Sequence, residues 1–342
     1  MRHGIAPPGG KPASSQMPCR QGWDGSVPQD RESGSRIKLV RIVRRQKRIL
    51  RRARFPLRRS KYANRIYSDH QHVILLALRQ HLRKSYRGLC ELMEACDSIL
   101  RELGLARVPH WTTLQKFSAR ADMRRLERLL LACLDDARLR ALDLAVDSTG
   151  FSSTSASEYY VSTLRRKRTG KPGRPPSRRE VRSYVKQTMA VETRTQLIAA
   201  VKFRRGPAND SPDFRRVLSK VAPARQHVRI IVADKGYDCE RNHEYAHDVL
   251  DAVAVIPVRG ADRPGIRISW KHRRRQARDL DKEAYHQRVK IETVHSVEKR
   301  RMGDNVLAIG TCQRHKELVF RAFAYNVGRL EVLFLLITED FY

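Results

Sequence analysis

The sequence is poor in acidic residues relative to basic ones. It has 70 lysines and arginines against 36 aspartates and glutamates, so its formal net charge at pH 7 is +34 over 342 residues. An excess of this size excludes an ordinary cytosolic metabolic enzyme and indicates a polyanionic partner. Because 41% of the residues are hydrophobic, enough material remains for a core, and the length predicts about two domains.

The sequence also lacks paired cysteines. Its six cysteines are scattered without a CxxC pair, which favours reduced thiols in a cytosol over a disulfide framework or a zinc ribbon. Cys239, His243 and His247 share one helix face at i, i+4 and i+8 and raise the question of zinc. That stripe is too long for a single ion and no further ligand pair lies nearby in sequence, so we do not predict a zinc site.

Long apolar segments are missing as well. The most apolar run, Val332 to Ile337, is far too short to span a bilayer. Residues 1–35 are polar and rich in Gly, Pro and Ser, without the apolar segment of a signal peptide. We therefore expect a soluble protein whose first 35 residues form a disordered tail or precede the true start.

Residues 36–66 form a strongly basic segment. Basic pairs such as Arg44-Arg45 and Arg51-Arg52 alternate there with Ile, Val and Leu. Two interpretations stay open, a basic arm lying on DNA phosphates and a solvated, weakly helical linker. We expect the arm, and neither interpretation provides sequence specificity.

Residues 67–140 carry four helical patterns. Ser68 with Gln71 forms a capping box before the first, and the second begins after Ser85 and runs to Gly104. Thr112 or Thr113 can cap a short third helix, and Asp122 opens a fourth that ends near residue 140. With the net charge, these patterns predict an all-helical DNA-binding domain of helix-turn-helix type, with the Thr112 helix contacting bases. A helical packing module without DNA contacts is the alternative.

The period of the pattern changes from helical to extended near residue 141. Leu142 to Gly150 is an apolar run ended by a turn, which predicts a strand that carries Asp147. Asp143 lies four residues earlier on the same strand face and is the alternative acid. Residues 183–191 and 196–203 then alternate as a hairpin, in which Lys186 is either functional or a solvated strand lysine.

A helix, two strands and a second acid follow the hairpin. Ser211 caps a helix that Pro212 begins, and the neighbouring acids Asp210 and Asp213 are expected to be capping residues. The apolar strand 227–232 delivers Asp234 into a glycine turn, the kind of place where sites in α/β folds collect. Residues 252–258 form a further strand.

One long helix near the C-terminal end carries an ordered set of polar residues. Residues 281–302 contain no Gly or Pro and predict one continuous helix. At about 100° per residue, Tyr285, Arg288, Glu292 and Lys299 form a single stripe about 60° wide. We expect Glu292 to look inward and Glu298 to project elsewhere. Without further information, a stripe of this kind is more typical of a salt-bridged helix edge than of a site that holds a metal ion beside DNA.

The stripe resembles a family signature. With gaps of two, three and six residues, it reproduces the Y-R-E-K motif of DDE transposases encoded by bacterial and archaeal insertion sequences. Asp234 begins a run, Asp-Lys-Gly-Tyr-Asp, that matches the family's second acid motif. The family's first acid precedes a Ser/Thr-rich turn, which favours Asp147 over Asp143, and Lys186 matches a family lysine. The resemblance covers roughly residues 67–330.

The resemblance implies a ribonuclease-H-like fold for residues 141–340, a mixed sheet with flanking helices, and the order of the predicted elements agrees with it. Asp147, Asp234 and Glu292 would be the catalytic acids and would bind two Mg²⁺ or Mn²⁺ ions, because three adjacent carboxylates repel one another without cations.

The implied activity is metal-dependent cleavage and strand transfer at the ends of an insertion sequence. Tyr285, Arg288, Lys299 and Lys186 would bind double-stranded DNA. A homodimer on DNA in a prokaryotic cytoplasm, associated with the nucleoid, is the expected setting. The alternatives are a catalytically inactive DNA-binding derivative and a nuclease of the same fold.

A basic insert separates the first two predicted strands. Its Gly173-Arg174-Pro175 core, flanked by Lys and Arg, resembles a minor-groove AT-hook and makes Arg174 a candidate DNA contact. A plain basic hairpin tip that binds phosphates is the alternative. Further along, Trp270 precedes a run of cations and either stacks on an unpaired base or packs on the protein surface.

Overall fold

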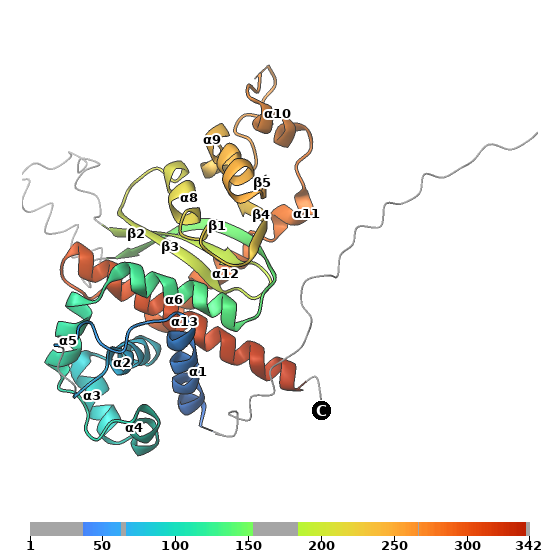
Figure 1. Cartoon of the computed structure of the whole chain (residues 1–342). Coiled ribbons are helices and arrows are strands. Elements are labelled where there is room, and N and C mark those ends of the chain that lie inside the picture. Colours follow the sequence, from blue (N-terminus) through green and yellow to red (C-terminus); the bar gives the residue numbers. More distant parts are fainter. Residues whose placement is uncertain (1–36, 63–65, 153–183, 266, 340–342) are drawn as a thin grey trace, which may run out of the picture.

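A five-stranded mixed sheet lies at the centre of the C-terminal half (Figure 1). The computed structural model describes residues 37–62, 66–152, 184–265 and 267–339. The strands are β1 (Ala141–Ser152), β2 (Tyr184–Glu192), β3 (Ile198–Arg205), β4 (His227–Ala233) and β5 (Val253–Val255), in the spatial order β3-β2-β1-β4-β5. β1, β2 and β3 pair antiparallel, whereas β4 and β5 run parallel to β1. This is the ribonuclease-H-like arrangement expected from the sequence.

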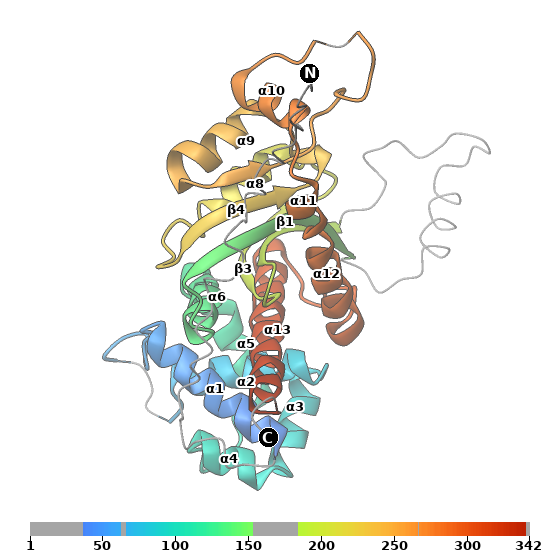
Figure 2. The ribbon, with the colours of Figure 1, turned by 90° about the vertical axis from the view of Figure 1, so that its right-hand side faces the viewer.

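Helices cover both faces of the sheet. On one face lie α8 (Ser211–Leu218) and α9 (Glu240–Glu244), and on the other α6 (Met123–Asp136) and α13 (Thr311–Glu339) (Figure 1). α13 runs between the sheet and the N-terminal helices (Figure 2). From it, the buried Asn326 amide exchanges two hydrogen bonds of 2.8 Å with the backbone of Ile198 on β3. The helix thereby ties both halves of the chain into one core.

The N-terminal region is helical, as the sequence predicts. It comprises α1 (Lys38–Arg52), α2 (Asp69–His81), α3 (Tyr86–Glu94), α4 (Asp97–Leu103), α5 (Trp111–Arg120) and α6. The Ser68–Gln71 capping box and the Asp122 cap are both present. The helix expected from Ser85 to Gly104 is split into α3 and α4, although it does end at Gly104, whose φ is +66°. α5 starts at Trp111, so the predicted Thr112 and Thr113 caps are wrong.

Within the basic segment 36–66, residues 38–52 do not form an arm. They form α1, which packs on α2, α4, α6 and α13 and buries Val43 and Ile49 completely. The Arg45 side chain, 9% exposed, donates to Glu331 at 2.6 Å and to Asp136 at 3.0 Å. Both earlier interpretations are therefore wrong for α1, because its cations face carboxylates inside the fold and its apolar residues belong to the core.

Some predicted features lie outside the described residues. These are the tail 1–35 and the basic insert with Arg174. Within the described ranges, no helix is both long enough and apolar enough to cross a membrane. The remaining helices are α10 (Lys271–Arg278), α11 (Lys282–His286) and α12 (Val289–Met302), with a 3₁₀ turn at Lys235–Tyr237 and a π turn at Tyr245–Val249.

Candidate active site

Asp147 and Asp234 lie side by side on adjacent parallel strands. In the β1–β4 register, Val146 is opposite Ala233, so the residue that follows each of them is an aspartate. Neighbouring strands are about 4.8 Å apart. β4 ends at Ala233 whereas β1 continues to Ser152, so the two carboxylates meet at the position where β1 loses its neighbour. The structure thus brings the first two predicted acids together.

The environment of Asp147 disfavours its charged form. Burial, followed by the nearby charge of Asp234, raises the pKa of Asp147 to about 6, although the Ser148 backbone N–H donates to its Oδ1 at 2.8 Å and Arg288 is near. The side chain is 21% exposed. A partly exposed carboxylate that lies beside another carboxylate is stabilised in its charged form by any cation that binds there. Divalent cations, which prefer carboxylate oxygen, fit this pair.

A hydroxyl cluster fixes the two strand ends relative to each other. The Ser148 hydroxyl lies 2.7 Å from the hydroxyls of both Thr188 on β2 and Tyr237, which follows Asp234. The Gly236 N–H donates to Asp234 Oδ1 at 2.8 Å. A Cβ at Gly236 would also lie 2.8 Å from that oxygen, so a larger residue there would displace the Asp234 carboxylate from its present position.

The predicted long helix is interrupted in its first half. α11 ends at His286 and α12 begins at Val289, with Gln287 and Arg288 in a tight turn between them. The Arg288 N–H donates to the Tyr285 carbonyl at 3.0 Å, three residues back, as in a 3₁₀ turn. The continuous helix is therefore wrong in detail, and the turn places Arg288 at the start of α12.

Arg288 joins the third acid to the first. Its Nη2 lies 2.6 Å from Glu292 Oε1, and its Nη1 lies 3.9 Å from Asp147 Oδ2. Glu292 thus reaches the Asp147 site through one guanidinium, although its side chain is 51% exposed and does not point into the core as expected. The structure thus brings Asp147 together with Arg288 and Glu292, which lie far from it in sequence.

His295, which sequence reasoning missed, also lies against Asp147. Its Nε2 is 3.9 Å from Asp147 Oδ2, and neither ring nitrogen has a hydrogen-bond partner within the described residues. Burial lowers the pKa of His295 to about 4, so the ring is neutral at physiological pH. Its spacing four residues after Ile291, on the buried face of α12, was the available signal.

The acid that α12 buries completely is Glu298, contrary to our expectation. Its side chain accepts a hydrogen bond from Gln187 Nε2 at 3.0 Å, and burial raises its pKa to about 7. Glu298 follows Ile291 by seven residues and so lies on the same face. The sequence contained that signal, but we assumed that a charged side chain would face outward.

The other predicted DNA contacts differ in the exposure and the partners of their side chains. Tyr285 is partly buried with the Arg288 guanidinium 6.0 Å from its ring centre, and Lys299 lies 5.5 Å from the ring centre of Phe151. Lys186 does not present its charge to solvent. Its ammonium, 5% exposed, pairs with Asp210 at 2.6 Å and Asp213 at 3.4 Å.

Two alternative assignments are resolved by these pairings. Asp210 is at the N-cap position of α8 as expected but makes no side-chain capping hydrogen bond, and both Asp210 and Asp213 pair with Lys186 instead. Asp143 pairs with Arg229 at 2.5 Å, with both guanidinium Nε and Nη2 donating to its carboxylate. Because Asp143 is occupied in this way, Asp147 is the better candidate for chemistry.

A set of arginines that the sequence did not reveal supports the Asp234 turn. Arg259 donates from its side chain to the carbonyls of Lys235 and Gly236 at 2.8 and 2.6 Å. Arg273 donates twice to Asp238, at 2.9 and 2.8 Å. Asp238, which the sequence suggests as a cap of the following helix, therefore pairs with Arg273 and does not cap α9. Its contacts with Arg273 and His243, together with the Arg259 N–H, lower its pKa to about 2 despite burial.

Within the described residues, no group of three or more His, Cys, Asp or Glu side chains is arranged to hold a metal ion. The Arg288 guanidinium supplies positive charge between Asp147 and Glu292. Asp147 and Asp234 nevertheless have the donor chemistry and the mutual repulsion that a divalent cation relieves.

The same part of the chain matches a family model. Residues 139–327, more than half of the chain, match the model described as the transposase DDE domain. The chain belongs to the DDE transposase family. The matched range contains all five strands, both aspartates and Glu292, so the family assignment and the geometry concern the same part of this transposase.

Comparisons with other proteins add little to the assignment. One matching solved structure is a piggyBac transposase synaptic complex with hairpin DNA, determined by cryo-electron microscopy. It is 9% identical to this transposase with a TM-score of 0.37, and the match covers 90% of this chain and 78% of that one. A likeness this distant carries no argument here. The comparison with curated proteins found no match.

Proposed function

We propose that this transposase cuts DNA strands at the ends of its own mobile element and joins them to a target. The proposal depends chiefly on one observation. Asp147 and Asp234 lie side by side where β4 ends, and Arg288 links Asp147 to Glu292. In this proposal the three acids hold two Mg²⁺ or Mn²⁺ ions.

The chemistry assigns a different task to each type of residue. When bound, the cations would activate a water or a 3′-hydroxyl and stabilise the leaving oxygen of an in-line displacement at phosphorus. Asp147, Asp234 and Glu292 would bind and orient them. Cations that reach the acids would take over the neutralising role of Arg288, whose guanidinium then pairs with a DNA phosphate.

Binding of double-stranded DNA is part of the proposal. Tyr285 and Lys299 lie on the same helical segment as Arg288 and would contact the terminal phosphates. The N-terminal helices, with the exposed Lys116 and Arg120 of α5, would hold the element end, and Arg174 a neighbouring groove. Paired ends require a homodimer on DNA, and the expected location is a prokaryotic nucleoid. The buried Lys186 is the weakest of the proposed DNA contacts.

Two alternatives are separated from this function by experiment. A catalytically inactive derivative would bind DNA without cutting it. A nuclease of the same fold would cut without joining, and it would not require the inverted repeats that flank a mobile element. The complete set of three acids favours the transposase over the inactive derivative.

The test is cleavage of DNA taken from either side of the reading frame, in Mg²⁺ and then in Mn²⁺. We expect single-strand nicks and joined products from the wild type. Asp234→Asn and Glu292→Gln should lose at least about a hundredfold in rate, while Asp143→Asn, the matched control on β1, keeps its activity. Undiminished nicking by Glu292→Gln would refute the assignment.

A further inference from the structure

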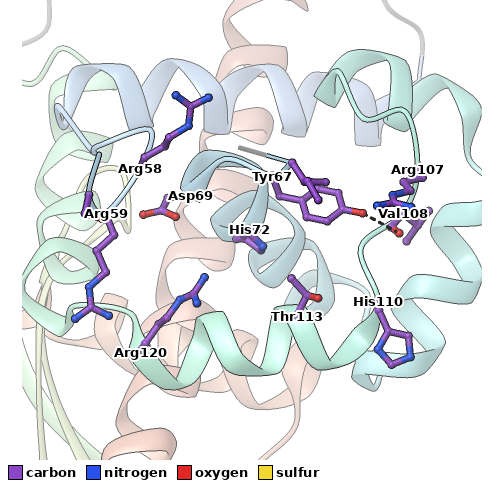
Figure 3. Close-up of a pocket in the computed structure, with 12 residues that line it drawn as sticks. Arg58, Arg59, Tyr67, Asp69, His72, Arg107, Val108, His110, Thr113 and Arg120 are labelled. Carbon is purple, nitrogen blue, oxygen red and sulfur yellow. Dashed lines mark hydrogen bonds between the residues drawn. The ribbon is translucent and has the colours of Figure 1, made fainter. Parts of the chain in front are cut away.

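A cavity of about 670 Å³ opens among the N-terminal helices, away from the three acids (Figure 3). It is formed by α2, by α5 and by the segments that precede each of them. None of its lining residues belongs to the sheet, to α11 or to α12. It is therefore a site separate from the candidate active site.

The lining of this cavity is strongly basic. Arg58, Arg59, Arg107 and Arg120 contribute to it, and Asp69 is its single acid. Arg58 and Arg59 lie at one end of the cavity and Arg107 at the other (Figure 3). Burial raises the pKa of Asp69, with Arg120 the largest opposing charge. Such a lining selects an anion, and phosphate is the group that arginines bind best.

A buried imidazole adds a feature that an anion alone does not explain. His72 is 3% exposed, and its Nδ1 lies 2.8 Å from the Ser68 carbonyl oxygen. A carbonyl only accepts, so Nδ1 carries the proton and Nε2 is left as an acceptor. Burial lowers the pKa of His72 to about 4, which keeps the ring neutral. Among the residues that the structure describes, Nε2 has no hydrogen-bond partner, and the ring lies in the middle of the lining (Figure 3).

Aromatic contacts hold that acceptor in place. The His72 ring stacks on Phe117 with centroids 4.6 Å apart and planes 9° from parallel. The Tyr67 ring meets it edge-on at 5.9 Å, and the Tyr67 hydroxyl donates to the Val108 carbonyl. The imidazole therefore cannot turn to find another partner without breaking the stack and the Ser68 bond.

We propose that this cavity binds one nucleotide unit of a nucleic-acid strand. Its phosphate would pair with Arg120 and the neighbouring arginines, and an N–H of its base would donate to His72 Nε2. A phosphodiester has no hydrogen to donate, so the sugar-phosphate backbone alone leaves Nε2 unpaired. The cavity is also much larger than a phosphate. The inference rests on the proposed DNA partner but not on cleavage.

The test is calorimetric titration of the full chain with three probes: deoxyadenosine monophosphate, 2-deoxyribose 5-phosphate and inorganic phosphate. We expect the nucleotide to bind with one-to-one stoichiometry and at least about tenfold more tightly than either of the other probes, because only it combines the phosphate with a base that fills the cavity and presents an N–H to Nε2.

Two variants separate the two halves of the site. His72→Asn keeps a donor for the Ser68 carbonyl but places no acceptor at the position of Nε2, so it should weaken nucleotide binding about tenfold and leave deoxyribose phosphate binding unchanged. Arg120→Gln should weaken all three probes. Arg101→Gln, an exposed arginine on α4 outside the cavity, is the matched control and should change none.

Equal affinity for nucleotide and inorganic phosphate would overturn the proposal in favour of a simple anion site, as would a His72→Asn chain that binds the nucleotide normally. If His72→Asn does not fold, Arg107→Gln replaces it, because Arg107 is exposed. Unchanged nucleotide binding by both Arg107→Gln and Arg120→Gln would then refute the site. If the wild-type chain binds the nucleotide but does not nick DNA, the proposed catalysis is refuted and the proposed nucleotide site is not.

Discussion

Replacing Glu298 by glutamine should stabilise the protein at alkaline pH. The Glu298 side chain is fully buried, and desolvation raises its pKa from 4.5 to about 7. Within the described part of the chain, Glu298 Oε1 and Gln187 Oε1 both lack hydrogen-bond partners. A proton on Glu298 would supply the missing donor between them, and the amide of Glu298→Gln supplies it at every pH.

The sign and size of the effect follow from linkage. The unfolded chain ionises Glu298 near pH 4.5, whereas the native chain holds the proton until about pH 7. Unfolding between these values releases a proton, so native stability falls as pH rises through this window and then levels off. The whole difference is about 3 kcal/mol at 1.4 kcal/mol per pH unit. Glu298→Gln should remove this loss.

Urea denaturation at pH 4.5, 5, 6, 7 and 8 measures the effect. We expect the variant to gain over the wild type steadily from pH 5 to pH 7 and to stay about 3 kcal/mol ahead at pH 8, relative to their difference at pH 4.5. Glu283→Gln, on the exposed surface of α11, is the control and should follow the wild type. A difference between Glu298→Gln and wild type that does not change with pH would refute the reasoning.

Three further predictions concern other parts of the fold. Asp147→Asn removes a carboxyl whose pKa is raised from 3.8 to about 6. In the presence of a chelator, the variant should therefore be more stable than the wild type above pH 6, by at most about 3 kcal/mol. Added Mg²⁺ should raise the melting temperature of the wild type and not that of the variant. Asp136→Ala leaves Arg45 without one of its two buried partners and should cost about 3 kcal/mol in urea denaturation; a cost below about 1 kcal/mol would mean that α1 is held by apolar packing alone. Gly236→Ala displaces the Asp234 carboxylate and should strongly reduce nicking while the far-ultraviolet circular dichroism stays native. Undiminished nicking would contradict the role of this carboxylate position.

Most of the fold and the principal acids could be predicted from the sequence. The strands that carry Asp147 and Asp234 have strong local signals, because an apolar run ended by a turn is a property of consecutive residues. Their pairing required the family resemblance, since nothing local indicates that β4 lies beside β1. Glu292 came from the spacing of the Y-R-E-K motif, although its predicted inward direction was wrong.

The failures share a physical cause. Charged residues were expected at the surface, yet the cations of α1 meet Asp136 and Glu331, and Lys186 meets Asp210 and Asp213. A buried ion pair needs both partners, and these partners lie from 24 residues apart, for Lys186 and Asp210, to 290 residues apart, for Arg41 and Glu331. Single-sequence periodicity carries no information about such distant pairs. The Glu298 error differs, because its position on the buried face of α12 was visible in the spacing.

The most direct test of the central claim is to load the protein with Fe²⁺ in place of Mg²⁺ and add peroxide and ascorbate, so that hydroxyl radicals cut the chain next to the metal. The account predicts cuts near Asp147, Asp234 and Glu292 together, competed by Mg²⁺ and lost in Asp147→Asn. Cuts confined to one of these segments, or located around His243 and His247, would contradict a metal site shared by the three acids.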